Sequence, residues 1–318
     1  MLIVQKFGGS SLAGAERLRR AASIIADSAD AGNKVVAVVS ARGDTTDELL
    51  GQARRISADP PVRELDALLS CGETGSAAMT AMQLADMGKS CVSLTGAQAG
   101  ILTDSVHGAA RILSIDTARI MRELDAGKIV VAAGFQGAER GGDTTTLGRG
   151  GSDTTAVELA AVLKADRCEI YSDVDGIYTA DPRLVTGAVR LDSIDYGDML
   201  HLALHGSQVL HSRSVEAAMR ANVRVHLLSS FTRHEGTVMC KLDDRPGLCG
   251  VTRDSSLGTV SIIGREADAH VLAEAVAALA HSDIIVTRTE LFDGGCSLFV
   301  SPDRLLPALE ITHRRFFR

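Results

Sequence analysis

Four glycine-rich polar segments carry the residues whose types and spacing could do chemistry. The first is Lys6-Phe7-Gly8-Gly9-Ser10-Ser11, which follows the apolar run Leu2–Phe7 and precedes a helical pattern. Glycines let backbone N–H groups approach phosphate oxygens closely, a helix N-terminus adds partial positive charge, and a lysine bridges phosphates as a point charge. This segment therefore predicts a phosphate-binding turn, although a tight strand-to-helix turn with a solvent-facing lysine would have the same sequence.

The second segment, Ser40-Ala41-Arg42-Gly43-Asp44-Thr45-Thr46-Asp47, follows the apolar run Lys34–Val39. Its hydroxyl groups and backbone amides are suited to contact an amino-acid substrate or a phosphoryl group in transfer. The same residue types cap a following helix, which is common at such positions. From this segment alone, both interpretations stay open.

The third segment runs from Thr144 to Thr155 and contains Gly148-Arg149-Gly150-Gly151-Ser152-Asp153. An arginine presents a planar fork of donors that matches a carboxylate better than a lysine does. Ser152 and Asp153 also suit the N-cap of the apolar helix predicted over Ala156–Leu163. Three glycines beside an arginine exceed what a cap requires, so this segment favours a carboxylate-binding site.

The fourth segment, Tyr171–Arg183, begins at the end of a β-rich run and is dense in carboxylates and hydroxyls. Such a loop suits a ribose, an adenine edge or a magnesium ion. The Asp173-Val174-Asp175 spacing resembles the start of an EF-hand loop, but the later ligand positions are absent. An acidic surface turn is the alternative interpretation.

These segments follow apolar, β-branched runs that alternate with helical patterns. The helical patterns lie at about Ala15–Asp30 and from about Asp47 onward, and further strands are predicted at Lys89–Leu94, Ile129–Ala133, Arg167–Ser172 and Val223–Leu228. Strands that alternate with helices indicate a mostly parallel sheet covered on both faces. Ligands gather at the carboxyl ends of such strands, which is where the four segments lie.

A polar stretch with proline and glycine, Lys241–Leu248, predicts a domain boundary at about residue 245. The chain beyond it reads strand, helix, strand, strand, helix, with these elements at Thr259–Ile263, His270–His281, Ile284–Phe292, Cys296–Val300 and Pro302–His313. This order resembles a small ferredoxin-like α+β module without a clear final strand. The predicted domains are therefore 1–244 and 245–318.

The composition of the 318 residues limits the kinds of partner. With 3% aromatic residues, no Trp and a formal net charge of -7, the chain lacks the stacking and basic surfaces that nucleic acids require. No apolar run approaches the length that spans a bilayer. The six cysteines form no C-x-x-C pair and suit reduced thiols. We therefore expect a soluble, cytoplasmic protein with small-molecule substrates, no nucleic acid and no membrane.

Together with Leu68–Glu73 and Gly127–Gly137, the four segments resemble the catalytic domain of aspartokinases over residues 1 to about 240. The resemblance implies the amino acid kinase fold, an α/β fold with a mostly parallel central sheet sandwiched by helices. A single, truncated ACT-like module would follow it. The resemblance also implies ATP and Mg²⁺ as co-reactants and aspartate kinase activity. Its product, 4-phospho-L-aspartate, leads towards lysine, threonine and methionine, or into a specialised pathway.

The resemblance assigns roles position by position. Lys6 and Asp153 match catalytic residues, and Mg²⁺ is expected mainly through the ATP phosphates rather than through protein ligands. In the aspartate site, Arg149 would pair with the α-carboxylate and Glu73 with the α-ammonium group. The remaining substrate positions are Ser40, Thr46, Gly150, Gly151 and Ser152. The ATP positions are Lys6, Gly8, Gly9, Ser10, Ser172, Asp173, Tyr178, Asp181, Arg183 and Gln208.

This set of residues suits phosphoryl transfer to a carboxylate. A carboxylate is already ionised at neutral pH, so the nucleophile needs no general base. Bringing an anion to a polyanion instead requires positioning and groups that neutralise negative charge. Lys6 and the glycine-rich turns offer such groups.

The chain departs from the family pattern in two places. Gln208 stands where the family usually has a lysine, which predicts weaker ATP binding or a compensating cation. In the C-terminal module, Arg265-Glu266-Ala267-Asp268-Ala269 replaces the proline-glycine turn of the first ACT module. We therefore expect no ordinary feedback inhibition by lysine or threonine, and a tail that mainly supports a homodimer or higher homo-oligomer.

Two other hypotheses remain. One is a related kinase with another carboxylate acceptor. The other is a nucleotide- and amino-acid-binding regulatory subunit with little turnover, which Gln208 and the short tail would suit. The presence of Lys6, Glu73, Arg149 and Asp153 favours an active kinase.

Overall fold

The structure, a computed structural model, describes residues 1–232 and 234–317. They form two compact units. The first unit comprises Met1–Asp175 and Val223–His234, and the second comprises Gly176–Asn222 and Glu235–Arg318. The expected domains, 1–244 and 245–318, stay predictions, because compact units and functional domains need not coincide.

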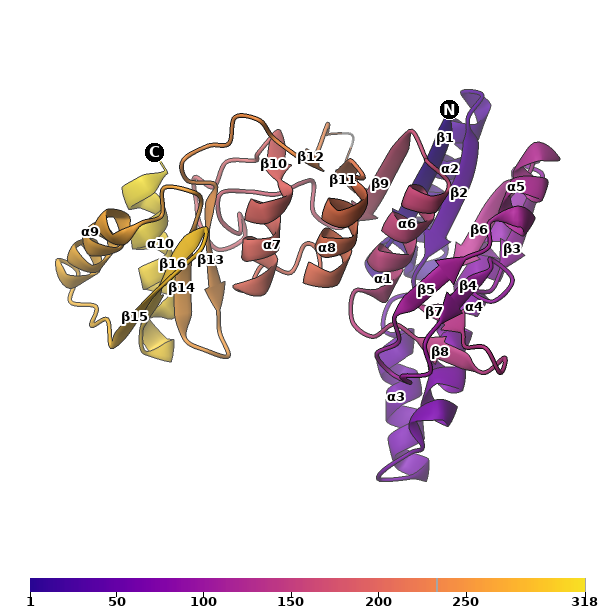
Figure 1. Ribbon diagram of the computed structural model, residues 1–318, viewed down its shortest axis with the longest axis horizontal. Coiled ribbons are helices and arrows are strands. Elements are labelled where there is room, and N and C mark those ends of the chain that lie inside the picture. The colour runs from indigo at the N-terminus through magenta and orange to yellow at the C-terminus, as the bar shows by residue number, and fades with distance from the viewer. Residues whose placement is uncertain (233, 318) are drawn as a thin grey trace. The chain divides into compact units, whose positions relative to one another are not determined.

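A parallel sheet is the centre of the first unit (Figure 1). Its strand order is β11 (Val225–Ser229), β9 (Arg167–Ser172), β1 (Leu2–Phe7), β2 (Lys34–Val39), β6 (Ile129–Ala133) and β3 (Cys91–Leu94), and every neighbouring pair is parallel. In β1, β2 and β6 every residue is buried except the first of β1 and of β2. Strands buried on both faces need apolar side chains at nearly every position, which explains the continuous apolar runs in the sequence.

Helices cover both faces of this sheet. α2 (Gly14–Asp30) and α4 (Val62–Asp86) pack on one face, in a core that includes Phe7, Ile25 and Leu84. α6 (Gly151–Val162) contacts β1, β2 and β9 on the other face (Figure 1). The remaining helices of this unit are α1 (Gly9–Leu12), α3 (Thr45–Ile56) and α5 (Ala118–Asp125).

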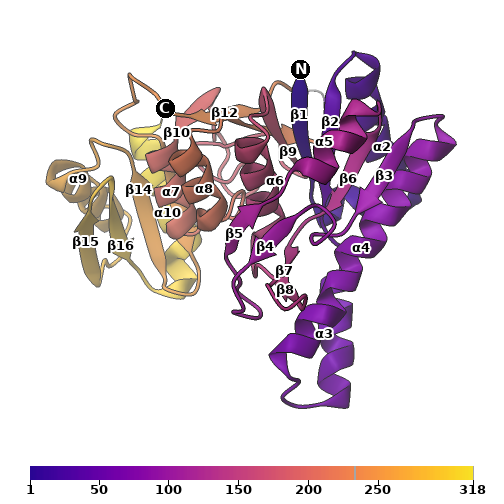
Figure 2. The ribbon, with the colours of Figure 1, turned by 45° about the vertical axis from the view of Figure 1, so that its right-hand side comes forward.

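Helix α4 extends beyond the sheet, and α3 runs beside its N-terminal part (Figure 2). Next to α4 lies a small four-stranded sheet, in the order β5 (Ile112–Ile115), β4 (Ile101–Thr103), β7 (Gln136–Ala138) and β8 (Thr144–Thr146). The buried carboxylate of Asp66 on α4 accepts hydrogen bonds from the N–H and hydroxyl groups of Thr146 and from the N–H of Gly108. Because its donors satisfy it, this carboxylate fixes β8, the strand with which the segment that contains Arg149 begins.

The second unit combines a short parallel pair with an antiparallel sheet. The parallel pair is β10 (Ser193–Asp195) and β12 (Thr237–Cys240), and it lies with α7 (Tyr196–Leu204) and α8 (Ser212–Ala221). The antiparallel order is β13 (Gly250–Asp254), β14 (Thr259–Ile263), β16 (Gly295–Phe299) and β15 (Arg288–Phe292). α9 (Ala269–Ala280) and α10 (Leu305–Phe316), the latter preceded by the short 3-10 helix η1 (Pro302–Arg304), pack side by side on this sheet (Figure 1).

The predicted α/β class is confirmed, with a mostly parallel sheet between helices and a small α+β module near the C-terminus. β13 was not predicted, because Gly250–Asp254 contains only one aliphatic side chain, Val251. β15 begins at Arg288 rather than at Ile284, since Ile284 is buried in the core of this unit instead of pairing in the sheet. Within the two described ranges, no helix combines the length and apolarity needed to cross a membrane.

Candidate active site

The carboxyl ends of the parallel strands bring the glycine-rich segments together. The N–H of Gly8 donates to the carbonyl of Tyr171 at 3.2 Å, which joins the first segment to the start of the fourth. The N–H of Gly43 donates to the carbonyl of Gly9 at 2.9 Å, which joins the first segment to the second. Parallel strands end at one edge of a sheet, so segments far apart in sequence become neighbours there.

The two glycines of the first turn have different surroundings. A Cβ atom at Gly9 would lie 2.7 Å from the carbonyl oxygen of Ala41, so any side chain would displace the second segment. A Cβ atom at Gly8 would have Lys6 Nζ as its nearest neighbour, at 3.6 Å. Gly9 is therefore required by packing, whereas Gly8 leaves open space beside a lysine ammonium group.

Lys6 and Asp153 form an ion pair between β1 and the first turn of α6. Their Nζ and Oδ1 atoms lie 2.6 Å apart, and the two side chains are 10% and 13% exposed. The N-terminus of α6 adds partial positive charge, which also favours the carboxylate. The first and third segments thereby place one cation and one anion, both nearly buried, at the same strand end.

Glu73, on α4, has an unusual environment for a carboxylate. The residue is 4% exposed, its Oε1 accepts a hydrogen bond from the N–H of Ala41 at 3.0 Å, and its Oε2 is buried with no hydrogen-bond partner among the residues that the structure describes. Burial raises the pKa of Glu73 to about 7, against a smaller lowering by the hydrogen bond from Ala41. A buried oxygen without a partner is costly, so this position suits a ligand that donates hydrogen bonds or carries positive charge.

Two glycines shape the turn around Arg149. Gly148 and Gly150 have φ values of 75° and 73°, in the left-handed region that favours glycine. Gly150 is the N-cap of α6, where Ser152 is buried while Arg149 is exposed. Among the ion pairs that the described residues form, none includes Arg149. Its guanidinium group is therefore available to an external carboxylate.

The other predicted positions near this strand edge are held by backbone contacts. The N–H of Ser40 donates to the carbonyl of Phe7 at 3.1 Å, and Thr46 is the second residue of α3. Ser10 lies in α1, and its carbonyl accepts a hydrogen bond from Arg17 Nη1 at 2.9 Å. Gly151 begins α6. All these predicted positions belong to the first unit.

Phe135 is a residue of this edge that the sequence analysis did not single out. Its φ is 67°, which is rare for a bulky residue. Its N–H donates to Thr155 Oγ1 at 3.2 Å, and its carbonyl accepts from the N–H of Leu147 at 2.8 Å. A Cβ atom at Gly151 would lie 2.9 Å from its ring. Strained backbone persists where surrounding contacts fix it, and it clusters at ligand sites; no sequence signal marks it at a phenylalanine.

The sequence profile of the amino acid kinase family matches residues 1–229. The chain belongs to the amino acid kinase family. The aspartokinase of Mycolicibacterium smegmatis is 48% identical to it over 289 residues, which are 89% of this chain and 69% of that relative. The predicted resemblance to aspartokinases is therefore confirmed.

Solved aspartokinase structures have the same fold. The aspartate kinase from Synechocystis gives a TM-score of 0.69 at 36% identity, over 99% of this chain and 55% of that one. The E. coli aspartokinase III in complex with aspartate and ADP gives a TM-score of 0.72 at 26% identity, over 98% of this chain and 84% of that one. The chain thus spans about half of the Synechocystis structure and most of the E. coli one.

The predicted nucleotide positions of this amino acid kinase divide between its two units. Ser172 ends β9 and Asp173 follows it in the first unit, and the others, Tyr178, Asp181, Arg183 and Gln208, belong to the second. Within the second unit, the carboxylate of Asp181 accepts hydrogen bonds from the N–H, Nε and Nη2 of Arg183, and these donors lower the pKa of Asp181. Gln208 is exposed.

Three serines meet at the ends of β9 and β11. The hydroxyl of Ser230 donates to Ser11 Oγ at 2.7 Å and lies 3.2 Å from the carbonyl oxygen of Ser172. Ser172 was predicted as a nucleotide contact, Ser11 lies in the predicted phosphate-binding turn, and Ser230 was not predicted. A polar doublet directly after a predicted strand, here Ser229-Ser230, is the signal that would have indicated the last of these.

Proposed function

We propose that the chain transfers the γ-phosphoryl group of ATP to the side-chain carboxylate of L-aspartate, giving 4-phospho-L-aspartate and ADP. The observation that carries this proposal is the buried Oε2 of Glu73, which has no partner among the described residues. A substrate with an ammonium group would supply the missing donor and compensate the buried charge. The aspartate and ADP in the related E. coli aspartokinase III support the same pair of ligands.

The acceptor amino acid would be held at both of its charged backbone groups. Glu73 would pair with the α-ammonium group, and the planar fork of Arg149 with the α-carboxylate. The remaining contacts are proposed for Ser40, Thr46, Gly150, Gly151 and Ser152. Two charge-assisted anchors fix the orientation of a small substrate, so its second carboxylate can be aimed at the phosphoryl donor.

The phosphoryl transfer itself needs no proton movement on the acceptor. One oxygen of the side-chain carboxylate attacks the γ-phosphorus, and the bond from that phosphorus to the β,γ-bridging oxygen breaks, so ADP leaves with the electron pair. Lys6 would neutralise charge on the transferring group, helped by backbone N–H groups of the turn at Gly8, Gly9 and Ser10. Asp153 would hold the Lys6 ammonium group in position through their 2.6 Å contact.

Mg²⁺ would enter as the partner of ATP. Within the residues that the structure describes, no three His, Cys, Asp or Glu side chains converge as a metal cage would require. Mg²⁺ favours one or two protein carboxylates together with substrate phosphates, and Asp153 offers one carboxylate beside the proposed phosphate turn. When bound, the ion would neutralise phosphate charge and orient the oxygens.

The predicted ATP positions stay proposals. Ser172 and Asp173 at the end of β9 are proposed contacts in the first unit. Tyr178, Asp181, Arg183 and Gln208 are proposed contacts in the second. We also propose that the protein works in the cytoplasm as a homodimer or higher homo-oligomer, assembled through the ACT-like module at 245–318. A monomer in light scattering would contradict this assembly.

Hydroxylamine trapping of the acyl phosphate tests the proposal. With ATP, Mg²⁺ and L-aspartate, we expect aspartyl hydroxamate from the wild type, little from Arg149→Ala, and normal amounts from Arg140→Ala, an exposed arginine of the β7–β8 turn. Turnover of glutamate or another acid in place of aspartate would reassign the acceptor. Binding of ATP without turnover of any acid would indicate a regulatory subunit.

A further inference from the structure

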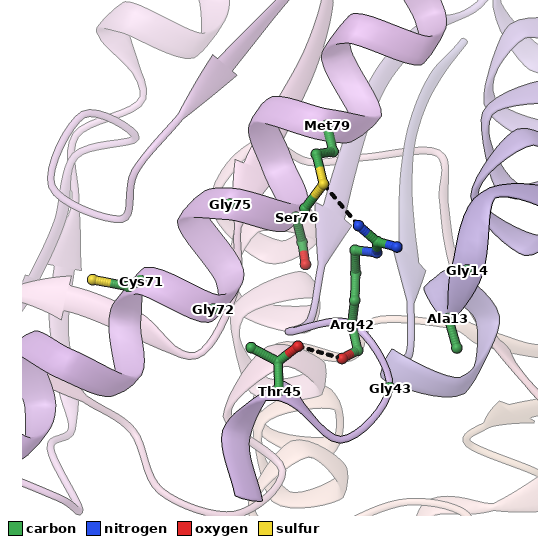
Figure 3. Close-up of a pocket in the computed structure, with 10 residues that line it drawn as sticks. All are labelled: Ala13, Gly14, Arg42, Gly43, Thr45, Cys71, Gly72, Gly75, Ser76 and Met79. Carbon is green, nitrogen blue, oxygen red and sulfur yellow. Dashed lines mark hydrogen bonds between the residues drawn. The ribbon is translucent and has the colours of Figure 1, made fainter. Parts of the chain in front are cut away.

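A cavity of about 360 Å³ lies beside the proposed acceptor site in the first unit (Figure 3). One wall is the face of α4 that carries Cys71, Gly72, Gly75, Ser76 and Met79, and the other is formed by Ala13, Gly14, Arg42, Gly43 and Thr45. Glu73 lies about 100° around α4 from Gly72, so its side chain leaves the helix on a different face. The cavity is therefore a neighbour of the acceptor site rather than part of it.

Two polar atoms at this cavity, Ser76 Oγ and Arg42 Nη1, lack a strong hydrogen-bond partner among the residues that the structure describes. Ser76 is fully buried, its Oγ has no hydrogen-bond partner in the described part of the chain, and it points into the space between α4 and Arg42 (Figure 3). Arg42 donates from Nε to the carbonyl of Leu12 at 3.1 Å, while its Nη1 lies 2.7 Å from the thioether sulfur of Met79, a weak acceptor. Among residues 1–232 and 234–317, no carboxylate forms an ion pair with Arg42. A hydroxyl and a guanidinium group thus face a space that holds no anion of the protein.

Gly75 keeps this space open. A Cβ atom there would have as its nearest neighbour the Met79 methyl group, at 3.9 Å, which is an ordinary contact distance. Packing therefore does not require glycine at this position, and glycine in a helix interior is unfavourable compared with alanine. The absence of a side chain at Gly75 has one evident effect, which is the volume of the cavity.

We propose that this cavity binds a small carboxylic acid with a short aliphatic chain. Arg42 and Ser76 would take the carboxylate, and Met79 with Ala13 would contact the chain. The volume lies near the lower end of the range for ligand pockets, which leaves room for an acid of a few carbon atoms. A thioether and a methyl group offer nothing to a second charged end, so a monocarboxylate is preferred to a phosphate or a dicarboxylate.

The position of the cavity couples it to the acceptor site. The Arg42–Thr45 wall continues directly from Ser40 and Ala41 and into Thr46, and the Gly72 wall adjoins Glu73. A ligand that joins Arg42 to Ser76 ties the second segment to α4 next to the hydrogen bond between Ala41 and Glu73. Occupancy would therefore change the affinity for aspartate, and aspartate would change the affinity for the acid by the same factor. This coupling, unlike the binding itself, rests on the proposed function.

Methyl NMR of Met79 tests the binding without any activity assay. Titration of protein labelled at the methionine methyl groups with butanoate should shift the Met79 signal, assigned with Met79→Leu, with a dissociation constant on the order of 1 mM. Butanamide, which has the same shape without charge, should bind at least about tenfold more weakly. Gly75→Leu should abolish the shift by filling the cavity, whereas Gly75→Ala should retain it. Arg42→Gln should weaken the binding of butanoate by about the same factor as the replacement of butanoate by butanamide does.

Three outcomes would contradict the proposed binding site. They are an unshifted Met79 signal in the wild type, equal binding of butanamide and butanoate, or unchanged binding in Gly75→Leu. The coupling is tested by the KM for aspartate, which butanoate should change in the wild type and in Gly75→Ala but not in Gly75→Leu. An identical KM with and without butanoate would overturn the coupling. A Met79 shift in a protein that phosphorylates no acid would reject the proposed function and support the binding site.

Discussion

Glu73 holds the backbone N–H of Ala41 through Oε1 at 3.0 Å and keeps Oε2 buried without a partner among the described residues. The first oxygen positions the second segment, and the second oxygen is the proposed acceptor for the substrate ammonium group. One side chain on α4 thereby connects the shape of the loop to the recognition of the substrate. Because burial raises the pKa of Glu73 to about 7, this connection has a measurable dependence on pH.

The value of kcat/KM for aspartate should fall by about tenfold for each pH unit below about 7. As the pH falls, Glu73 takes up a proton and loses the charge that attracts the ammonium group. Initial rates at subsaturating aspartate, measured over about pH 5 to 9, give this profile. Glu73→Gln should have a low value that no longer changes across the same window. If the variant kept the acidic decline, another group would be responsible.

The same burial predicts that Glu73 lowers the stability of the free protein. Its pKa of about 7 in the folded chain exceeds the ordinary value of 4.5, so between these pH values the folded state binds more protons than the unfolded state. The free energy of unfolding therefore decreases as the pH rises through this window. Glu73→Gln keeps the acceptor for Ala41 and removes the charge. The free energy of unfolding of this variant should exceed that of the wild type by about 3 kcal/mol at about pH 8, and by little at about pH 4.

Urea unfolding of the variant and of the wild type, carried out at each of the two pH values, measures this difference in the free energy of unfolding. A variant that is less stable than the wild type at the higher pH would show that the charged carboxylate is satisfied in the free protein. Activity lost together with stability gained is the expected signature of a group that is retained for binding.

Variants of the Lys6–Asp153 pair should affect catalysis and stability differently. Lys6→Met should lower kcat by a factor on the order of 10²–10³, because it removes a positioned positive group. It should also cost roughly 3 kcal/mol of unfolding free energy, because Asp153 would remain as a nearly buried charge without its partner. The double variant Lys6→Met/Asp153→Asn should recover most of the stability and none of the kcat. Thermal unfolding measures the stability of both variants, and single-turnover rates measure their catalysis. A double variant as unstable as the single variant would contradict the view that the unpaired charge of Asp153 causes the loss of stability.

Gly9 and Gly8 provide a matched comparison of packing. Gly9→Ala should destabilise the protein by about 1–3 kcal/mol, because its Cβ would lie 2.7 Å from the carbonyl oxygen of Ala41. Gly8→Ala should change the stability little, because its Cβ would have 3.6 Å of clearance and its backbone, with φ -71° and ψ 165°, suits alanine. Urea unfolding measures the loss of stability in each variant. Equal losses would show that the close contact at Gly9 does not determine the effect of the substitution.

Much of the fold could be predicted, because buried parallel strands appear in the sequence as continuous apolar runs. Leu2–Phe7, Lys34–Val39 and Ile129–Ala133 were predicted with the bounds that the structure has. Among the strands that were not predicted, β13 has two buried residues and three half-buried ones, so it carries neither a continuous run nor a clear alternation. The hydrophobic pattern of a partly covered strand is weak, because its apolar positions depend on which parts of the strand the neighbouring elements cover.

The candidate site was predictable as segments and not as contacts. Glycine-rich turns after strands mark the edge at which a site forms, and the order of the strands then decides which turns meet. The pairing of Lys6 with Asp153 depends on α6 packing against β1, which no local pattern encodes. The isolated oxygen of Glu73 and the positive φ of Phe135 are results of tertiary packing as well. The sequence offers residue types, whereas burial and strain arise only in the folded chain.

Gln208 offers a test of the nucleotide side of the site. It is exposed and follows α7 in the second unit, at a position where the aspartokinase resemblance places a lysine. If that position contacts the ATP phosphates, Gln208→Lys should lower the KM for ATP about fivefold, since one added charge near an anion in water contributes about 1 kcal/mol. The gain should shrink at high ionic strength, where exposed charges are screened. Gln208→Met has similar length and no charge, so it should leave the KM close to that of the wild type. A lysine variant indistinguishable from the methionine variant would mean that ATP is held without this position, and that the cation missing at Gln208 is not required by this chain.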